Sequence, residues 1–409
     1  MALHSRADPG YIGKSMFALL LLAASIHTDF LGGSLGKIEW VTPVHARCAV
    51  EGESDQDGRN RQANWYYFRV DGARDQELTL DLVDLVGEYN FRPGSHAVTK
   101  DTHPVYSYDG RHWRHFDAIE WDDQEVRLRL RFSPAQDTVW IAHVPPYTND
   151  HLSLLINDVA NHPHFQREAA GRTVEGREML LLTVTDPQVP PQEKKVVWLM
   201  FRQHSWETGS SWAGEGALRF LLSDAPEAAR MRRGAIFKIF PMADPDGVAR
   251  GGVRFNAHGY DLNRNWDAVD AKLMPEIAAQ RKAVLDWVDS KRPVHLFLSL
   301  HNTETSEYLE GPAEYRELAD RLRKMLVEMT TFHPTRAEPR DAASSTTPEK
   351  PGRMSVNQGL HHDRRIPAML MEQMVTFNTK LGRRPTIQDR LDFGAGLVRA
   401  IWRTLTDTE

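Results

Sequence analysis

The chain has 409 residues and a formal net charge of -6 at pH 7, with 26% charged residues. Single hydrophobic cores seldom grow beyond ~250 to 300 residues, so this length predicts two domains. The acidic balance provides no excess of Lys and Arg to bind phosphate backbones or anionic lipid headgroups, so we expect neither nucleic acid nor a membrane as a partner. Cys48 is the only cysteine, which excludes an internal disulfide and a CxxC zinc site and leaves histidine and carboxylate as the expected ligands of any metal.

Residues 1–25 are predicted to form an extension in front of the first domain. The segment "GKSMFALLLLAAS" places Lys14 before a short apolar run that ends in small residues, a pattern typical of a signal peptide. The run is too short to span a membrane, and the strand-like segment "KIEWVTPV" follows almost at once. We expect a cytoplasmic protein, with export to the periplasm or beyond as the alternative if residues 1–25 act as a signal peptide.

Residues 26–150 are predicted to form a β domain. The short alternating segments "WYYFRV", "LTLDLVDL", "VRLRLRF" and "TVWIAHV" are separated by clusters of Gly, Pro, Asp and Asn, which is typical of a compact antiparallel fold. A helix is expected to follow, with Asn149 or Asp150 as its N-cap and an apolar face that begins at Leu152.

Residues 151–409 are predicted to form an α/β domain. The apolar segments "EMLLLTVT", "KKVVWLMF", "AIFKIFPM" and "PVHLFLSL" alternate with longer helical stretches such as "AKLMPEIAAQRKAVLDWVDS". Strands without a polar face are buried on both sides, so the pattern predicts a mixed, largely parallel sheet with helices on both faces.

Two histidines stand directly after predicted strands of this domain. His204 follows "VVWLMF", His301 follows "VHLFLSL", and Glu207 lies three residues after His204. Ligands of open α/β sheets bind outside the carboxyl ends of the strands, so these side chains are expected to converge. Two histidines and one carboxylate are the ligand set of hydrolytic zinc sites, which leave a fourth position to water. The alternative is that both histidines are ordinary hydrogen-bonded residues at strand ends, because the chain contains the His-x-x-Glu pattern twice.

The motifs around these residues resemble a known family. "HSWETGSSW", "DPDGVARGGVRFNAHGYDLNRNW" and "LHNTE" are similar to successive motifs of the zinc metallocarboxypeptidases, in particular the cytosolic-carboxypeptidase-like branch. The resemblance extends to "GGSLGKIEWV", "NWYYFRV" and "VPPYTNDHL", so it covers most of the chain from about Ile26 onward. It implies an all-β, sandwich-like N-terminal domain, a catalytic α/β domain and one zinc ion per chain.

The resemblance also implies how the zinc ion is bound. It makes His204, Glu207 and His301 the three zinc ligands and Asp261 the acid that orients the first histidine. An ionised partner on the far ring nitrogen would fix the histidine tautomer and raise its basicity as a ligand.

Four further residues match substrate-binding and catalytic positions of the family. Asn263 and Arg264 match the pair that holds the terminal carboxylate of the substrate, a task that suits the planar guanidinium fork. Arg254 matches the arginine that stabilises the oxyanion, and Glu372 matches the general base.

The predicted function is therefore zinc-dependent carboxypeptidase activity, the hydrolysis of the C-terminal peptide bond of peptide or protein substrates. One alternative is a zinc deacylase of N-acyl amino acids on the same fold, and another is a non-catalytic binding protein. The additional β domain and the "DLNRNW" motif favour the carboxypeptidase over the deacylase.

The sequence departs from the secreted members of the superfamily near the expected side-chain pocket. Those members carry a mobile tyrosine upstream of the catalytic glutamate, whereas no tyrosine follows Tyr315 here. Trp206 stands where the secreted relatives have an arginine. Lys350 and Arg353 would suit acidic terminal side chains, and the alternative is that they are two solvated charges on a surface loop.

Overall fold

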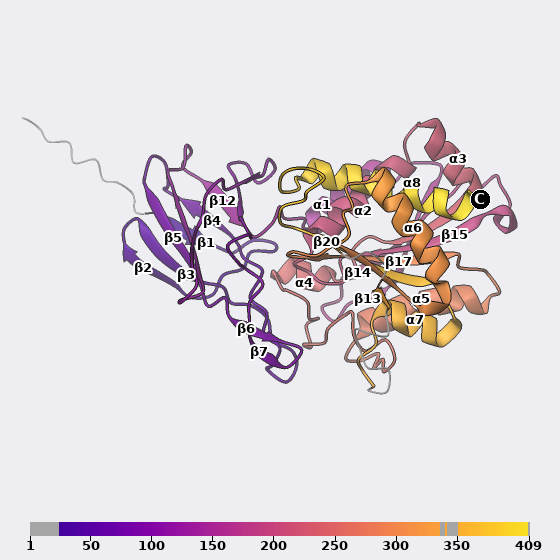
Figure 1. Cartoon of the computed structure of the whole chain (residues 1–409), viewed down its shortest axis with the longest axis horizontal. Helices are drawn as coiled ribbons and strands as arrows, with labels where there is room; N and C mark the ends of the chain where they lie inside the picture. Colours follow the sequence, from indigo (N-terminus) through magenta and orange to yellow (C-terminus); the bar gives the residue numbers. More distant parts are fainter. Residues whose placement is uncertain (1–23, 336–339, 342–350, 408–409) are drawn as a thin grey trace, which may run out of the picture.

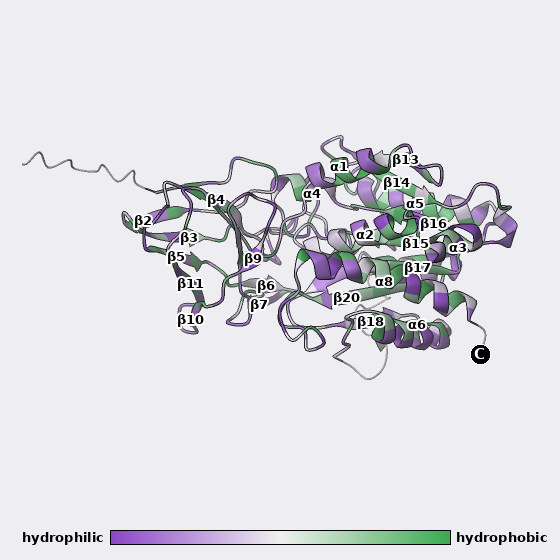
Figure 2. Cartoon of the chain, turned by 90° about the horizontal axis from the view of Figure 1, so that it is seen from above, coloured by the Kyte–Doolittle hydropathy of each residue, from purple (hydrophilic) through white to green (hydrophobic). Residues whose placement is uncertain are grey.

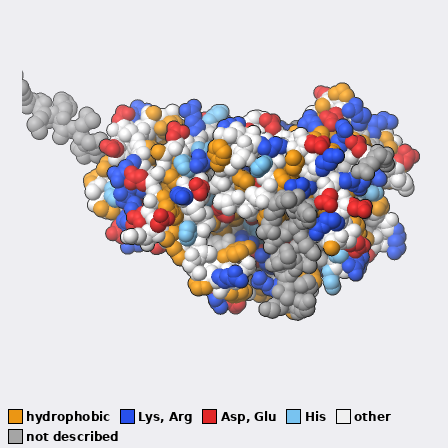
Figure 3. Space-filling view, viewed as in Figure 1, with side chains coloured by type: hydrophobic (Ala, Val, Ile, Leu, Met, Phe, Trp, Pro, Cys, Tyr) orange, Lys and Arg blue, Asp and Glu red, His pale blue; other side chains and the backbone are white. Residues whose placement is uncertain are grey.

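A computed structural model describes residues 24–335, 340–341 and 351–407 of the chain. An N-terminal β-rich part lies at one end of an elongated molecule, and an α/β part forms the other end (Figure 1). Most of the predicted extension 1–25, with its signal-peptide pattern, lies outside the described residues, as does Lys350. On the face seen in Figure 3, Lys and Arg side chains are interspersed with Asp and Glu.

The N-terminal part contains two five-stranded sheets that share one hydrophobic core. The first sheet has the order β1 (Ser25–His27), β4 (Tyr67–Asp71), β12 (Val139–Ala142), β8 (Val105–Ser107) and β9 (Arg114–His115). The second has the order β10 (Glu120–Asp122), β11 (Arg127–Phe132), β5 (Leu78–Val83), β3 (His45–Ala49) and β2 (Ile38–Thr42). A separate hairpin, β6 (Gly87–Tyr89) and β7 (Arg92–Ser95), lies on the side nearest the α/β part (Figure 1).

Alternation along the strands builds this core. Leu80 and Leu82 of β5 are fully buried, and they face Val70 and Ile141 from the other sheet within one cluster. Side chains of a strand alternate between the two faces of a sheet, so every second residue reaches the shared interior. The predicted β-sandwich-like fold is confirmed. One pairing differs from the expected antiparallel pattern, because β3 and β5 run parallel. The intervening strand β4 belongs to the other sheet, so the chain crosses over and returns in the same direction.

Helix α1 (Asn149–Val159) follows the β domain. Its N-cap is Thr148, not Asn149 or Asp150 as predicted, and the backbone N–H of Thr148 donates to Nδ1 of His151 at 3.1 Å. Buried residues of α1 join the core of the α/β part. The division at residue 150 stays a prediction.

The α/β part is built on one eight-stranded mixed sheet. Its order is β13 (Phe165–Arg172), β14 (Glu178–Val184), β16 (Ala235–Phe240), β15 (Lys195–Phe201), β17 (Leu296–Thr303), β20 (Ala368–Met374), β18 (Tyr308–Gly311) and β19 (Arg340–Asp341). The four central strands, β16, β15, β17 and β20, are parallel. Strands β13 and β14 pair antiparallel, and β18 runs antiparallel to β20 and parallel to β19. The predicted α/β class with a mixed sheet is confirmed.

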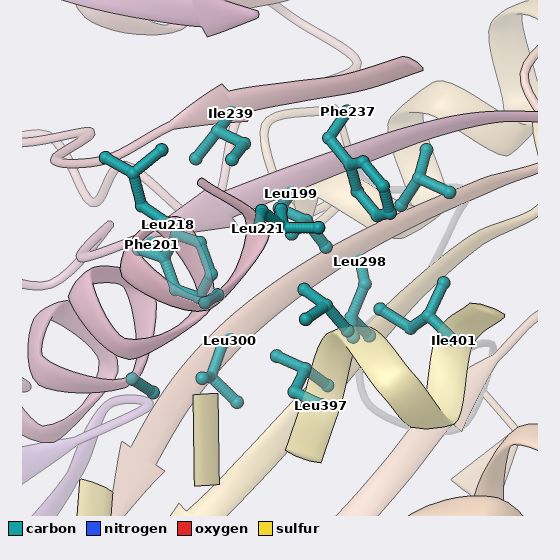
Figure 4. Close-up of a cluster of buried hydrophobic side chains, with 14 of the residues drawn as sticks. Leu199, Phe201, Leu218, Leu221, Phe237, Ile239, Leu298, Leu300, Leu397 and Ile401 are labelled. Carbon is teal, nitrogen blue, oxygen red and sulfur yellow. The ribbon is translucent and has the colours of Figure 1, made fainter. Parts of the chain in front are cut away.

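Helices cover both faces of this sheet (Figure 1). One face packs against α1, α2 (Thr208–Leu221), α3 (Pro226–Gly234), α6 (Arg316–Met329) and α8 (Ile387–Thr406). The other packs against α5 (Pro275–Asp289) and α7 (Val356–Arg364). Within β15, Leu199 and Phe201 point into the first core, where they meet Leu218 and Leu397 (Figure 4), and Trp198 points into the second. Hydrophobic residues therefore fill the sheet and the helix faces turned toward it (Figure 2). Among the described residues, no helix is both long and apolar enough to cross a membrane.

The two parts of the molecule share an apolar contact beside the carboxyl ends of the central strands. Trp65 and Tyr67 of the β domain form one buried cluster with Trp206, Val253 and Val375 of the α/β domain. The β domain is thus packed against the edge of the sheet where the predicted site residues emerge.

Candidate metal centre and active site

The first predicted metal-binding segment is held by a buried arginine. Arg202 follows the end of β15 with a positive φ of 61°, a conformation that turns the chain sharply after the strand. Its guanidinium donates to the carbonyl of Ser205 at 2.8 Å and to Oγ of Ser211 at 3.0 Å. Burial lowers the pKa of Arg202 to about 9. The turn presents His204 away from the strand and places Glu207 as the N-cap of α2.

The three predicted ligands meet at one point. Nδ1 of His204 lies 2.6 Å from Oε1 of Glu207, and Nδ1 of His301 lies 2.9 Å from Oε2 of the same carboxylate. The three ligand atoms lie within 4.8 Å of one another, and all three residues are buried. His204 comes from the turn after β15 and His301 from the adjacent parallel strand β17, so the convergence follows from the shared carboxyl edge of the sheet.

The far ring nitrogens of both histidines are hydrogen-bonded. Nε2 of His204 lies 3.1 Å from Oδ1 of Asp261, and Nε2 of His301 lies 3.0 Å from Oε1 of Gln203. With Nε2 protonated as the donor in each case, both Nδ1 atoms keep their lone pairs for a metal. Burial alone would raise the pKa of Asp261, but Arg254 and His204 hold it well below its usual range.

This donor set fits zinc. Two imidazole nitrogens and one carboxylate are zinc ligands with room for a fourth group. Oε2 of Glu207 and Nδ1 of His301 are buried and close, yet they are not aligned as a hydrogen bond, so a bound cation would satisfy both. The two histidines hold the pKa of the Glu207 carboxyl below its usual range against the effect of burial. The ligand is therefore ionised at neutral pH.

Glu372 lies beside the ligand set. It is the register partner of His301 across the parallel pair β17 and β20. Oε2 of Glu372 is buried and has no hydrogen-bond partner among the described residues. Burial together with the nearby Glu207 carboxylate raises the pKa of Glu372 well above its usual range. A carboxylate whose pKa is raised is a stronger base than an exposed one, which is the property required of the predicted general base.

His204, Glu207, Arg254 and Glu372 line one cavity of about 300 Å³. The side chain of Arg254 enters this cavity, and its Nε donates to Oδ2 of Asp261 at 2.9 Å. The predicted oxyanion-stabilising guanidinium thus lies next to the predicted metal ligands.

A second cavity of about 220 Å³ adjoins the first, and Arg254 lines both. Arg264 and Arg353 also line the second cavity. Asn263 is buried, and its Oδ1 accepts a hydrogen bond from the backbone N–H of Val356 at 2.9 Å, so the amide oxygen is already in use. The structure therefore brings Arg264, but not the Asn263 side chain, to the wall of the cavity.

Sequence reasoning missed the contribution of the β domain to this cleft. Nine of its residues line the first cavity, from a loop between β3 and β4 and from the β6–β7 region, and they include Arg61, Gln62, Asn64, Tyr89 and His96. Tyr89 lines both cavities, and the guanidinium carbon of Arg254 lies 5.7 Å from the centre of its ring. The loop contains no periodic pattern or motif that would have identified these residues from the sequence alone.

Comparison with known proteins agrees with this arrangement. The zinc carboxypeptidase profile matches residues 152–346, and the cytosolic carboxypeptidase N-terminal domain profile matches residues 26–144. The chain belongs to the zinc carboxypeptidase family. The predicted family is thereby confirmed, the His-Glu-His set agrees with the zinc cofactor that the family implies, and neither the deacylase nor the binding-protein alternative is favoured.

Two human members of the family are similar to this chain in sequence. Cytosolic carboxypeptidase 6 is 32% identical over 313 residues, which cover 72% of this chain and 59% of the relative. Cytosolic carboxypeptidase 2 is 30% identical over 266 residues, which cover 59% of this chain and 29% of the relative. The chain therefore spans less than a third of that relative's length.

A solved structure shares the whole fold. The metallo-carboxypeptidase from Burkholderia cenocepacia superimposes with a TM-score of 0.79 at 23% identity, and the match covers 93% of this chain and 99% of that chain. The solved structure thus also has a β domain in front of its α/β domain.

Proposed function

We propose that this chain is a zinc-dependent carboxypeptidase that hydrolyses the C-terminal peptide bond of peptide or protein substrates. The observation that carries the proposal is the meeting of His204, Glu207 and His301 around one point, with Glu372 on the adjacent strand. In this proposal the first three residues bind the zinc ion, and Glu372 is the general base.

His204, Glu207 and His301 would hold the zinc ion, which when bound polarises the scissile carbonyl and lowers the pKa of its water toward ~7. Glu372 accepts a proton from the attacking water as the new C–O bond forms, and it passes that proton to the amine nitrogen as the C–N bond breaks. Its position beside His301 and its raised pKa support both steps.

Arg254 and Arg264 supply the positive charge of the site. Arg254 donates hydrogen bonds to the oxyanion of the tetrahedral intermediate, and its place on the walls of both cavities supports this role. Arg264, whose Nη1 donates to the backbone carbonyl of Asn263 at 2.8 Å, binds the terminal carboxylate in the second cavity. A chain end fixed there would place its last peptide bond in the first cavity, which accounts for exopeptidase specificity.

A further arginine in the second cavity suggests which C-terminal residue the substrate carries. Arg353 lines the second cavity beside Arg264, and burial and the Arg264 charge lower its pKa. An acidic terminal side chain would neutralise this pair of guanidinium groups, so we assign a preference for C-terminal Glu or Asp. Several relatives are named cytosolic carboxypeptidases, and we place this chain in the cytoplasm by analogy.

The test is a release assay on a peptide library, read by mass spectrometry with and without a chelator. Loss of single residues from free C-termini that stops on chelation supports the proposal. Glu372→Gln should remove turnover while zinc remains bound, and Glu168→Gln, on the opposite edge strand β13, is the matched control. Activity restricted to N-acyl amino acids would establish the deacylase, and Glu372→Gln with unchanged turnover would exclude the proposed general base.

A further inference from the structure

Two residues of the β domain that contact Arg254 belong to one short paired segment. Glu53 and Gln62 form an isolated antiparallel bridge, in which each backbone N–H donates to the carbonyl of the other at 2.9 Å. Their side chains therefore reach the α/β domain from a single loop between β3 and β4, which the two backbone hydrogen bonds of this bridge stabilise.

The carboxylate of Glu53 binds the backbone of the segment that carries Arg254. Its Oε2 accepts the N–H groups of three consecutive residues, Val253 at 2.8 Å, Arg254 at 2.7 Å and Phe255 at 2.9 Å. Successive N–H groups turned toward one point form a concave anion site, and a carboxylate fits it well. The other oxygen accepts from Nη2 of Arg250 at 3.3 Å. These contacts fix the main chain on both sides of Arg254.

Gln62 fixes the side chain of the same arginine. Nη1 of Arg254 donates to Oε1 of Gln62 at 3.0 Å, while Nε donates to Asp261 at 2.9 Å. The guanidinium is held at two of its three nitrogens, and Nη2 lies 3.2 Å from Nε2 of His204 at the ligand set. Arg254 is consequently only 8% exposed, although it lines both cavities.

We propose that the β domain is a working part of the active site, with Glu53 and Gln62 as positioning residues that hold Arg254 in the orientation required by the transition state. This inference rests on the proposed oxyanion role of Arg254. A donor that is already oriented stabilises developing charge without reorganisation, and one such donor is typically worth ~10² to 10³ in kcat. Misplacement by about 1 Å can cost ~10²-fold. Loss of the Glu53 or the Gln62 contact is therefore expected to reduce turnover more strongly than it weakens substrate binding.

The first experiment compares steady-state kinetics of the full-length zinc-loaded chain and its variants. Glu53→Ala is expected to lower kcat by about 10- to 100-fold with KM changed by less than about threefold, because the lost interaction acts in the transition state. Glu53→Gln keeps an oxygen that can accept the three N–H groups and should recover most of the rate. Gln62→Ala should lower kcat in the same manner. Glu120→Ala, which removes an exposed ion pair with Arg131 on the second sheet, is the control and should match the parent.

A double-mutant cycle separates positioning from general destabilisation. If Glu53 acts through Arg254, Glu53→Ala should cost little further in an Arg254→Ala background, since coupled residues are not additive. An equal loss of kcat in both backgrounds would overturn the inference, as would unchanged kcat in Glu53→Ala and Gln62→Ala.

A measurement without turnover keeps the inference distinct from the proposed function. Hydrogen exchange at the amides of residues 253–255 should be faster in Glu53→Ala than in Glu120→Ala, with zinc content unchanged. Exchange rates equal in the two variants would refute the positioning role. A parent chain that releases no C-terminal residue would refute the carboxypeptidase proposal, while the exchange rates would still decide whether Glu53 orders this segment.

Discussion

Replacing His143 with Phe should make the chain less sensitive to acid. The His143 ring is fully buried between Tyr66 and Trp206, at centroid distances of 5.4 and 5.6 Å. Within the part of the chain that the structure describes, neither ring nitrogen has a hydrogen-bond partner. Burial lowers the pKa of His143 to about 3. The neutral ring is therefore retained in the folded chain over a pH range in which a free histidine is protonated.

The size of the effect follows from this pKa difference. The unfolded chain takes up a proton at this residue below pH ~6.5, whereas the folded chain does not until about pH 3, so stability is lost as the pH falls across this window. Each pH unit is worth ~1.4 kcal/mol, so His143 should contribute about 2 kcal/mol of the stability lost between pH 7 and pH 5. Phe fills a similar volume and does not titrate.

Urea unfolding at half-unit intervals from pH 7 to pH 5 measures this contribution. The free energy of unfolding of His143→Phe should fall by about 2 kcal/mol less than that of the parent over this range. The packing cost of the larger Phe ring does not depend on pH, so it shifts the free energy of unfolding without changing its slope with pH. Parallel slopes would show that the folded chain protonates His143 readily, and the argument from burial would then be wrong.

Two further predictions concern the active site. Asp261→Asn should weaken zinc binding by about 10- to 100-fold, because the carboxylate that orients Nε2 of His204 is lost. Competition with a chromogenic chelator measures the change in zinc affinity. An unaltered affinity would contradict the role assigned to Asp261. Arg264→Ala should raise KM for peptides with a free C-terminus much more than it lowers kcat, since it removes a charge-assisted contact present in both ground and transition states. C-terminally amidated peptides supply the comparison, and equal losses on both substrate types would argue against carboxylate recognition by Arg264.

The convergence of the three proposed zinc ligands could be predicted from the sequence because it follows from the regular strands that carry two of them. His204 and His301 stand directly after apolar segments, and parallel neighbours such as β15 and β17 bring their carboxyl ends to one edge. Glu372 is a register partner of His301 in the next strand, which gives the family resemblance at that position a geometric basis. Apolar segments that alternate with longer helical stretches are strong local signals, so the fold class was also predictable.

The residues that were missed lie in irregular backbone or depend on contacts between distant segments. Glu53 and Gln62 sit in a loop without periodicity, about 200 residues away in sequence from the arginine segment that they bind. No local pattern encodes such a contact. Gln203, which binds His301, is adjacent to a predicted ligand, but an amide has no distinctive spacing. The parallel pairing of β3 with β5 was likewise hidden, because short alternating strands indicate a β domain but not the order of its strands.

The central claim is that His204, Glu207 and His301 bind one zinc ion, and zinc content is its most direct test. After reconstitution and desalting, metal analysis should give one zinc per chain for the parent and for His362→Gln, which changes an exposed histidine. The folded His301→Gln variant, verified by circular dichroism, should retain far less zinc. Zinc retained equally by His301→Gln and the parent, or no zinc in the parent, would contradict the account.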